Sequence, residues 1–457
     1  MELREFLDQI PNYKEFMTIA ELNASSKNLA REFENVELKE IGKSREDRPI
    51  YSLMIGEGEK NALLYAFPHP NEPIGSMSLE FLSWFLAKNP NFTNESGYKW
   101  YIIKAIDIDG AILNEGWFKG NFNPLKYAKN FYRPAPFEQV DWTFPVKYKK
   151  LQFNSPLPET RSLMELMINI KPKFMYSFHN SSFGGVYFYI SREIGSMCDD
   201  LVNFVTKEKL PLHLGEPEMS SIKKIHDGFF QPIGVQEMYD SFVDEGVENP
   251  QQVIKCGTSS FDYLKNIIDN ESFSFTCEIP YFYDKTIGDS SLLDDERKDL
   301  RLGSLEYIKE IYKQAKKIFR SIRKYSNKNT RIYTAIDDYL RRRGSIISLQ
   351  IHEAKTSSFY DRKATVAQAF DLNVSKPWYD LLNASMVTRL CDEALAYHPE
   401  NKVEITTIKK NYDNWIEQKV NEILSRTKFK VIPIQKLVRV QVGSALITLK
   451  NLSLNKH

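Results

Sequence analysis

The sequence has 457 residues, of which 42% are hydrophobic and 26% are charged, and these values are ordinary for a globular protein. Its 61 basic and 60 acidic residues give a formal net charge of +1, which offers no electrostatic reason to expect nucleic acid or an anionic membrane as a partner. The four cysteines show no Cys-x-x-Cys spacing, so we expect free thiols rather than a disulfide framework.

The N-terminal residues carry charges at Glu2, Arg4 and Glu5, where a signal peptide needs an apolar core. No stretch of the sequence approaches the roughly 20 consecutive apolar residues of a membrane span. We therefore expect a cytoplasmic protein without a transmembrane segment.

The first two thirds of the chain predict strands that alternate with helices. Strands are predicted at 51–55, 61–67, 100–106, 173–179 and 273–277. Helices are predicted at about 75–88, 158–170 and 302–325. This alternation favours an α/β fold with a central mixed, largely parallel sheet flanked by helices. The stretch 107–155 is long, aromatic and rich in Pro, Asn and Gly, and such loops usually have a binding or lid role.

Beyond a polar segment at 324–329, the sequence predicts a mostly helical C-terminal extension. Its helices are expected at about 331–343, 361–370, 377–396 and 404–426, followed by a final strand at 437–449. We therefore expect one domain at 1–325 and a second, mainly helical domain with a terminal strand at 330–457. The length of the second part is typical of a domain, and its residues indicate no chemistry.

His69 and Glu72 form a His-x-x-Glu pair between an apolar run at 62–67 and a predicted helix, and His179 follows another apolar run. If the two strands are parallel neighbours, both histidines emerge at the same sheet edge, where α/β proteins place their sites. Two histidines and a glutamate give Zn²⁺ three protein ligands and leave a fourth position for water. A lone histidine at a strand end is usually structural, so the prediction depends on the three residues occurring together.

Glu278 is the candidate proton carrier. An acidic side chain that ends the apolar run 273–277 is costly to bury without a purpose. In a partly dry cleft beside the metal, it could take the proton of a zinc-bound water and pass it to the leaving amine. The simpler alternative is a glutamate at a strand end that faces the solvent.

Together these motifs resemble those of the M14 zinc carboxypeptidases. That family carries His-x-x-Glu after one strand, a distant His after another, and a Phe-Thr-x-Glu run that here spans 275–278. The segments 107–110 and 257–263 are similar to the family's Asn-Pro-Asp-Gly and Gly-Gly-Ser-x-Asp-Trp segments. The resemblance covers roughly residues 15–320, and it makes 1–325 an M14-like zinc peptidase domain.

The resemblance also implies roles for individual residues. One Zn²⁺ per chain is expected to be held by His69, Glu72 and His179, and Glu278 is expected to act as general base and acid.

The substrate-binding loop departs from the family pattern. Where the family carries Asn-Arg-Asn before an aromatic residue, this chain has Ala-Lys-Asn, with Lys129 in place of the arginine and Asn130 after it. Either Lys129 or Arg133 is then the clamp for the substrate carboxylate, and Lys119 is nearest to a second family arginine. Phe261 falls at the position of the residue that selects the substrate side chain, and it indicates selection without charge. The basic residues could equally be solvated loop charges.

The resemblance implies zinc-dependent hydrolysis of a peptide bond, with removal of C-terminal residues from peptides as the preferred reading. The altered clamp leaves open a zinc amidase or deacylase that acts on acylated amino acids or on cell-wall-derived peptides. A third alternative is an inactive M14-fold binding protein. The expected partner is a peptide or small amide substrate, with no nucleic acid and no membrane.

Overall fold

The computed structural model describes residues 2–218, 222–232, 234–244 and 246–454. Its strands are β1 (Val36–Lys43), β2 (Pro49–Ile55), β3 (Lys60–Tyr65), β4 (Tyr98–Ile103), β5 (Val146–Tyr148), β6 (Leu151–Phe153), β7 (Phe174–Ser177), β8 (His179–Phe183), β9 (Tyr187–Ile190), β10 (Lys224–His226), β11 (Phe229–Phe230), β12 (Phe273–Tyr283), β13 (Leu292–Glu296), β14 (Lys363–Thr365) and β15 (Lys430–Val431).

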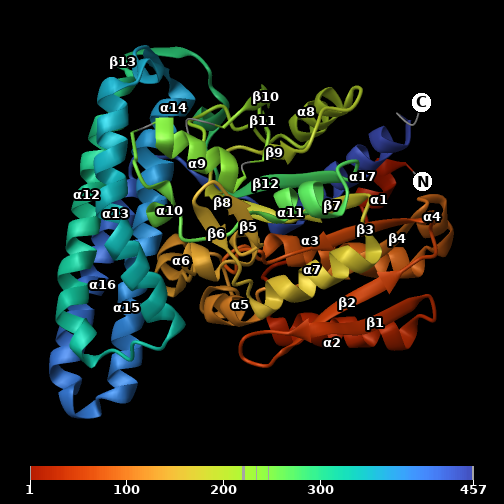
Figure 1. Ribbon diagram of the computed structural model, residues 1–457, viewed down its shortest axis with the longest axis horizontal. Helices are drawn as coiled ribbons and strands as arrows, with labels where there is room; N and C mark the ends of the chain where they lie inside the picture. The colour runs from red at the N-terminus through yellow and green to blue at the C-terminus, as the bar shows by residue number, and fades with distance from the viewer. Residues whose placement is uncertain (1, 219–221, 233, 245, 455–457) are drawn as a thin grey trace.

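The α-helices of the first part are α1 (Leu3–Leu7), α2 (Ile19–Glu32), α3 (Ile74–Lys88), α4 (Pro90–Glu95), α5 (Ile108–Asn114), α6 (Pro124–Asn130), α7 (Pro158–Ile170), α8 (Met197–Lys207), α9 (Val235–Asp244), α10 (Pro250–Val253) and α11 (Ser260–Tyr263). Those that follow are α12 (Arg297–Ile322), α13 (Arg331–Thr356), α14 (Val366–Phe370), α15 (Lys376–Tyr397), α16 (Lys402–Leu424) and α17 (Ile434–Leu454). In Figure 1, α12, α13, α15 and α16 stand as an upright bundle beside the sheet.

One mixed sheet of eleven strands forms the centre of the described structure, in the order β1-β2-β4-β3-β7-β12-β9-β11-β10, with β8 and β15 also paired to β12. Its middle strands β4, β3, β7 and β12 run parallel to one another. Strands β1, β2 and β9 are antiparallel to their neighbours nearer the centre. This mixed sheet with helices around it confirms the predicted fold class.

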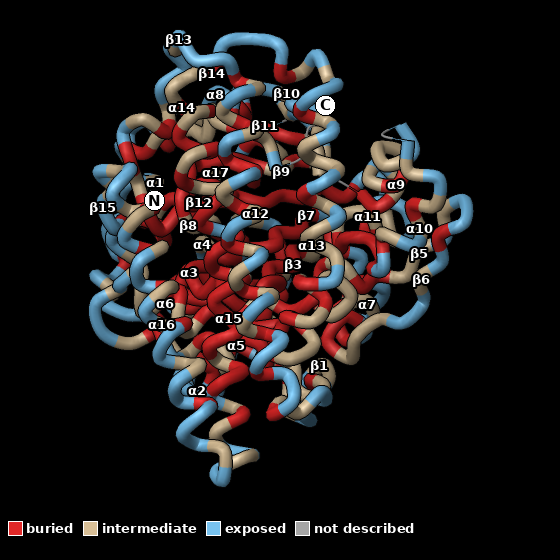
Figure 2. Tube along the Cα trace, turned by 90° about the vertical axis from the view of Figure 1, so that its left-hand side faces the viewer, coloured by how far each residue is buried: buried red, intermediate tan, exposed pale blue. Residues whose placement is uncertain are grey.

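The middle strands are apolar because helices cover the sheet and leave little of it in contact with water. Every residue of β7 is buried, as are all residues of β12 before its last. Figure 2 shows the buried residues concentrated along these strands and the helices packed on them. Helix α3 is buried on most sides, because it packs between α17 and the sheet.

Parts of the C-terminal extension also belong to this core. Helix α17 packs against α3, α8 and β12, and β15 adds to the edge of β12. Leu63 of β3 and Val442 of α17 occur in one hydrophobic cluster. The division into residues 1–325 and 330–457 stays a prediction.

The predicted final strand at 437–449 is wrong, because these residues lie within α17. Their valine-rich composition is typical of strands, but packing against α3, α8 and β12 decides the local structure here. A helix buried to this degree is apolar around much of its circumference, so its sequence lacks the amphipathic helical period that would have distinguished it.

Two further boundaries differ from expectation. Glu278 lies inside β12 rather than at its end, because β8 and β9 pair with the second half of this strand and extend it to Tyr283. The predicted strand 173–179 divides into β7 and β8 on either side of Phe178. The stretch 107–155, expected to be a long loop, contains α5, α6 and the β5–β6 hairpin.

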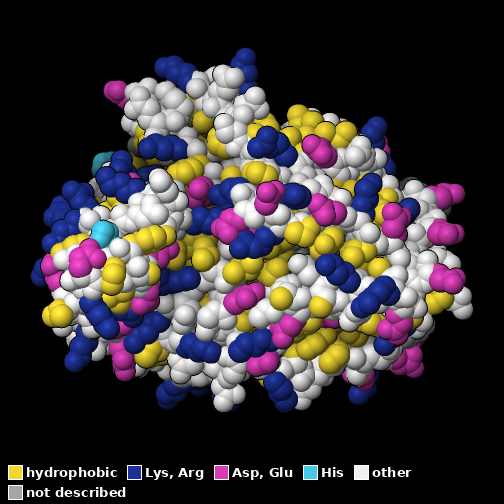
Figure 3. All heavy atoms as spheres, turned by 90° about the horizontal axis from the view of Figure 1, so that it is seen from below, with side chains coloured by type: hydrophobic (Ala, Val, Ile, Leu, Met, Phe, Trp, Pro, Cys, Tyr) yellow, Lys and Arg dark blue, Asp and Glu magenta, His cyan; other side chains and the backbone are white. Residues whose placement is uncertain are grey.

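None of the described helices combines the length and the apolar character needed to cross a bilayer. On the face shown in Figure 3, basic and acidic side chains are interspersed, in keeping with the formal net charge of +1.

A buried ion pair joins α3 to the end of β4. Lys104 Nζ donates to Glu80 Oε2 at 2.7 Å, and Ser25 Oγ on α2 donates to Glu80 Oε1 at 2.6 Å. Burial lowers the pKa of Lys104, while the charge of Glu80 acts in the opposite direction. Each partner therefore depends on the other for its charge to be tolerated inside the protein.

Replacing Glu80 by Gln should lower the free energy of unfolding by about 3–5 kcal/mol, because the Lys104 ammonium is then buried without a counter-charge. Glu80→Leu combined with Lys104→Met should cost much less, since no charge remains in the interior. Urea unfolding followed by circular dichroism measures both variants. A Glu80→Gln variant as stable as the wild type would contradict this role for the pair.

Candidate metal centre and active site

The parallel pairing of β3 with β7 brings His69 and His179 together. Tyr65, the last residue of β3, is paired with Ser177, the last residue of β7, so the two chains leave the sheet side by side. Glu72 is held near His69 by a tight turn, in which the Glu72 N–H donates to the His69 carbonyl at 3.2 Å. Helix α3 begins two residues after Glu72. All three side chains therefore lie at the edge of the sheet where β3 and β7 end.

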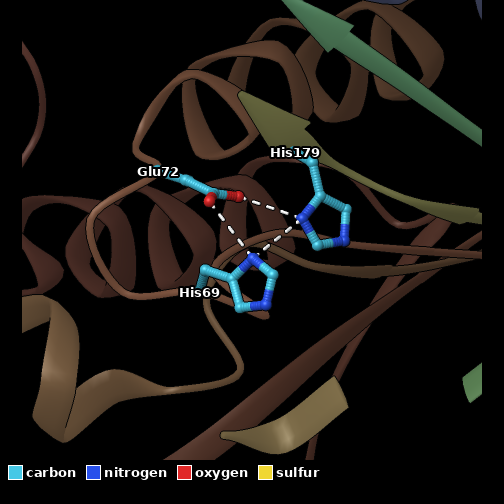
Figure 4. Close-up of side chains that lie close together, drawn as sticks. All are labelled: His69, Glu72 and His179. Atoms are coloured by element: carbon cyan, nitrogen blue, oxygen red, sulfur yellow. Dashed lines mark hydrogen bonds and ion pairs between the residues drawn. The ribbon is translucent and has the colours of Figure 1, made fainter. Parts of the chain in front are cut away.

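The side chains of His69, Glu72 and His179 converge (Figure 4). His69 Nδ1 lies 3.1 Å from Glu72 Oε1, and His179 Nδ1 lies 3.0 Å from Glu72 Oε2. The two Nδ1 atoms are 3.1 Å apart, and the ligand atoms of all three residues lie within 4.8 Å of one another. Two imidazole nitrogens and a carboxylate in this arrangement fit the ligand set of a catalytic Zn²⁺ site.

His179 is oriented by a second carboxylate. Its Nε2 lies 3.0 Å from Asp141 Oδ2 and 2.9 Å from Ser177 Oγ, which leaves Nδ1 directed at Glu72. Asp141 is in turn held by Tyr65, whose hydroxyl donates to Oδ1 at 3.1 Å. A carboxylate behind a histidine fixes its ring and tautomer and makes it a better metal ligand.

The electrostatic environment differs between the two histidines. Burial and the neighbouring Arg133 lower the pKa of His69 to about 4, so its imidazole is neutral at neutral pH. Burial would also lower the pKa of His179, but hydrogen bonds with Asp141 and Glu72 raise it well above its usual value. Binding of a cation at His179 therefore requires the loss of a proton from Nδ1.

Arg133 occupies the position next to the glutamate. Its Nη1 donates to Glu72 Oε1 at 2.9 Å and to Asn71 Oδ1 at 3.2 Å. Its Nε is buried and has no hydrogen-bond partner among the described residues. Arg133 thus places a positive charge beside the three converging side chains. Its Nε–H remains available to donate a hydrogen bond to a ligand.

Glu278 faces the same group of residues from β12. It is paired with His179 on β8 in parallel register, and its Oε1 lies 3.9 Å from His179 Nδ1. Burial raises the pKa of Glu278 well above its usual value, against the lowering effect of His179. A carboxyl group whose proton affinity is raised in this way holds a proton more readily than a solvated carboxylate, which suits a group that must return a proton.

These residues line a cavity of about 640 Å³, within the range usual for ligand sites. Its wall includes Asp141 and Trp142 of the 107–155 stretch, together with side chains from α12, α13 and α15. Tyr339 of α13 and Tyr379 of α15 are examples from the C-terminal extension. The extension therefore shapes the space in front of the three converging side chains.

The residues predicted to bind substrate are divided between two places. Arg133 and Phe261 line the cavity. The other three are not among the described lining residues. Lys119 forms ion pairs with Glu15 and Glu21. Lys129 Nζ lies 3.8 Å from Glu417 Oε2, and Asn130 Nδ2 donates to the Lys126 carbonyl.

Several residues that support the site were not anticipated from the sequence, namely Tyr65, Asp141, Ser177 and Gln441. Gln441 on α17 donates through Nε2 to the His179 carbonyl at 2.7 Å. An amide side chain inside the apolar run 437–449 was a usable signal for Gln441, since a buried polar group needs a partner. Asp141 lies in a short 3₁₀ helix, Val140–Trp142, and its sequence neighbourhood gives no sign that it lies close to His179.

A family model described as zinc carboxypeptidase, Peptidase_M14, matches residues 22–360. No curated protein matches the chain.

Solved structures that resemble the chain are carboxypeptidases and related proteins. Carboxypeptidase A from Helicoverpa armigera is 15% identical, with 62% of this chain and 71% of that chain covered and a TM-score of 0.40. Bovine thrombin-activatable fibrinolysis inhibitor is 15% identical, with 60% and 88% covered and a TM-score of 0.35. A metallo-carboxypeptidase from Burkholderia cenocepacia is also 15% identical, with 58% and 60% covered and a TM-score of 0.35.

The resemblance inferred from the motifs is confirmed by the match of the family model, which spans well over half of the chain. This protein belongs to the zinc carboxypeptidase family, Peptidase_M14.

Proposed function

We propose that this protein is a zinc-dependent peptidase that removes C-terminal residues from peptides. The observation that carries the proposal is the convergence of His69, Glu72 and His179 in one cavity, with Glu278 beside them. Zn²⁺ held by these three residues would polarise the carbonyl of the bond to be cleaved and make water more acidic.

The chain's own residues then supply proton transfer and orientation. Glu278 takes a proton from the attacking water and returns it to the departing amine. The raised pKa of Glu278 suits the second step, and the positive charge of a bound metal would favour the carboxylate that the first step needs. Asp141 holds the ring of His179, and Arg133 offers a positive charge to the oxygen on which negative charge develops.

A zinc amidase or deacylase is the second candidate. The observation in its favour is that Lys119, Lys129 and Asn130 are absent from the described cavity lining, although they are nearest in sequence to the family's clamp residues. A substrate without a free C-terminal carboxylate would have less need of such a clamp.

Glu278→Gln should lower kcat by roughly 10²- to 10⁴-fold, because the amide cannot accept the water proton. The zinc content should remain equal to that of the wild type, as measured by inductively coupled plasma mass spectrometry. Glu271→Gln, an exposed change just before the same strand, serves as the matched control and should keep full activity.

An active Glu278→Gln enzyme would disprove the assigned role. If the zinc-loaded wild type binds peptides without any turnover, the chain is instead a binding protein that retains the M14 fold.

Asp141→Asn should weaken zinc binding by about 10- to 100-fold, because His179 loses the carboxylate that fixes its ring. Competition with a chromophoric zinc chelator measures the affinity directly. Asp295→Asn, on the exposed strand β13, is the control and should bind zinc like the wild type. Equal affinities for all three proteins would remove Asp141 from the metal centre.

Peptides with free and amidated C-termini should separate the two candidate functions. For a carboxypeptidase, amidation removes the charge that positions the substrate, so we expect a loss in kcat/KM of at least roughly 100-fold. Hydrolysis followed by mass spectrometry gives both the rate and the bond cleaved. Equal rates on the two forms would favour the amidase or deacylase.

A further inference from the structure

The cavity extends from the metal-ligating side chains to helix α12 and to helix α15, the second of which belongs to the C-terminal extension. These helices pack against each other in the bundle seen in Figure 1. Arg301 on α12 and Lys376 and Trp378 on α15 line this part of the cavity. Their side-chain donors make few hydrogen bonds, unlike the paired arginines elsewhere in the wall.

Arg301 is a buried cation with an unused donor. Its side chain belongs to a residue that is only 5% exposed, and its Nε has no hydrogen-bond partner among the described residues. One turn earlier, Arg297 shows the usual arrangement, with Nε and Nη2 donating to the Glu216 carboxylate at 2.6 and 3.0 Å. A buried guanidinium is costly unless a counter-charge accepts its hydrogen bonds, so Arg301 lacks a partner that its position demands.

Lys376 adds a second cation to the same region. Its Nζ donates to the Pro217 carbonyl at 3.3 Å, a neutral group that leaves most of its hydrogen-bonding capacity unused. Burial and the positive charge of Arg301 lower the pKa of Lys376, while the charges of Glu216, Asp371 and Glu218 act in the opposite direction without offsetting them. The two cations therefore repel each other, and an anion bound between them would relieve this repulsion.

Trp378 supplies a further donor in the same wall. The residue is fully buried, and its Nε1 has no hydrogen-bond partner among the described residues. An indole N–H can only donate, so its natural partner is an acceptor such as a carboxylate oxygen.

The carboxylates nearby are already bonded to other groups. Glu216 accepts from Arg297, and Asp371 accepts from the Glu216 N–H at 2.7 Å and from Ser375 Oγ at 2.8 Å. Glu218 accepts from the Tyr187 hydroxyl at 2.6 Å. Two other arginines of the cavity wall are paired as well, Arg342 with Asp338 and Arg343 with Asp380.

We propose that Arg301 and Lys376, with the indole of Trp378, form a subsite for a carboxylate group of the substrate. This proposal rests on the proposed peptidase function and names the substrate class, which is peptides with a carboxylate placed to reach α12 and α15. The carboxylate is either an acidic side chain or the C-terminus itself. In both cases the cations on α12 and α15 select the substrate by its charge.

The test uses the zinc-loaded full chain with Arg301→Gln and Lys376→Gln, and four blocked peptides that end in Glu or Gln with free or amidated C-termini. Loss of a charged hydrogen bond should raise KM by roughly 10- to 100-fold for the peptides that use the subsite, with little change in kcat. An effect on Glu peptides alone identifies an acidic side chain. An effect on both free-acid peptides and on neither amide identifies the C-terminus.

Arg320→Gln, the same substitution on the exposed face of α12, is the matched control and should leave every KM unchanged. Arg301→Lys keeps the charge and should recover part of the affinity lost in Arg301→Gln, which a folding defect would not explain. Unchanged KM values for all four peptides in both variants, Arg301→Gln and Lys376→Gln, would overturn the proposal.

Calorimetric titration with N-acetylglutamate tests the subsite without any turnover. The wild type should bind this probe roughly 10- to 100-fold more tightly than Arg301→Gln. Because this measurement needs no catalysis, it can support the subsite even if the protein is not a peptidase. The subsite and the peptidase function can therefore be disproved independently. Equal Kd values for the wild type and Arg301→Gln would overturn the subsite.

Discussion

The parallel alignment of β3, β7 and β12 is the constraint on which the site depends. Because Tyr65 of β3 lies opposite Ser177 of β7, the segments that lead to His69 and His179 start at the same level of the sheet. The continuation of β12 beyond β7 places Glu278 beside His179 on β8. A slip of one residue in either pairing would turn one of these side chains to the opposite face.

The convergence of His69, Glu72 and His179 could be predicted from the sequence because each lies near the end of an apolar strand, and local patterns reveal strands well. Asp141 could not, because it reaches His179 only through the folding of the 107–155 stretch. Arg301 could not for a different reason, since a basic residue on a charged helix is expected to face water. Its burial follows from the packing of α12 against α15, which no local pattern encodes.

The C-terminal extension is joined to the segment 107–110 by charge, in addition to its packing against other elements of the first part of the chain. Arg331, at the start of α13, lies 3.6 Å from Asp107 and 3.4 Å from Asp109, within the stretch that resembles Asn-Pro-Asp-Gly. Both carboxylates are buried, so their charges need a nearby cation. The extension thereby contributes to the stability of the same part of the chain whose cavity it helps to line.

Gln441 connects the order of synthesis to the completion of the site. Its amide bonds the carbonyl of His179, and α17 follows all of the other described elements in the chain. While a nascent chain is being made, the strands that carry the histidines can pair before α17 is available to cover them. The site then reaches its final rigidity only after α17 has packed, so the pairing of the strands and the completion of the site are separate steps in the folding of the chain.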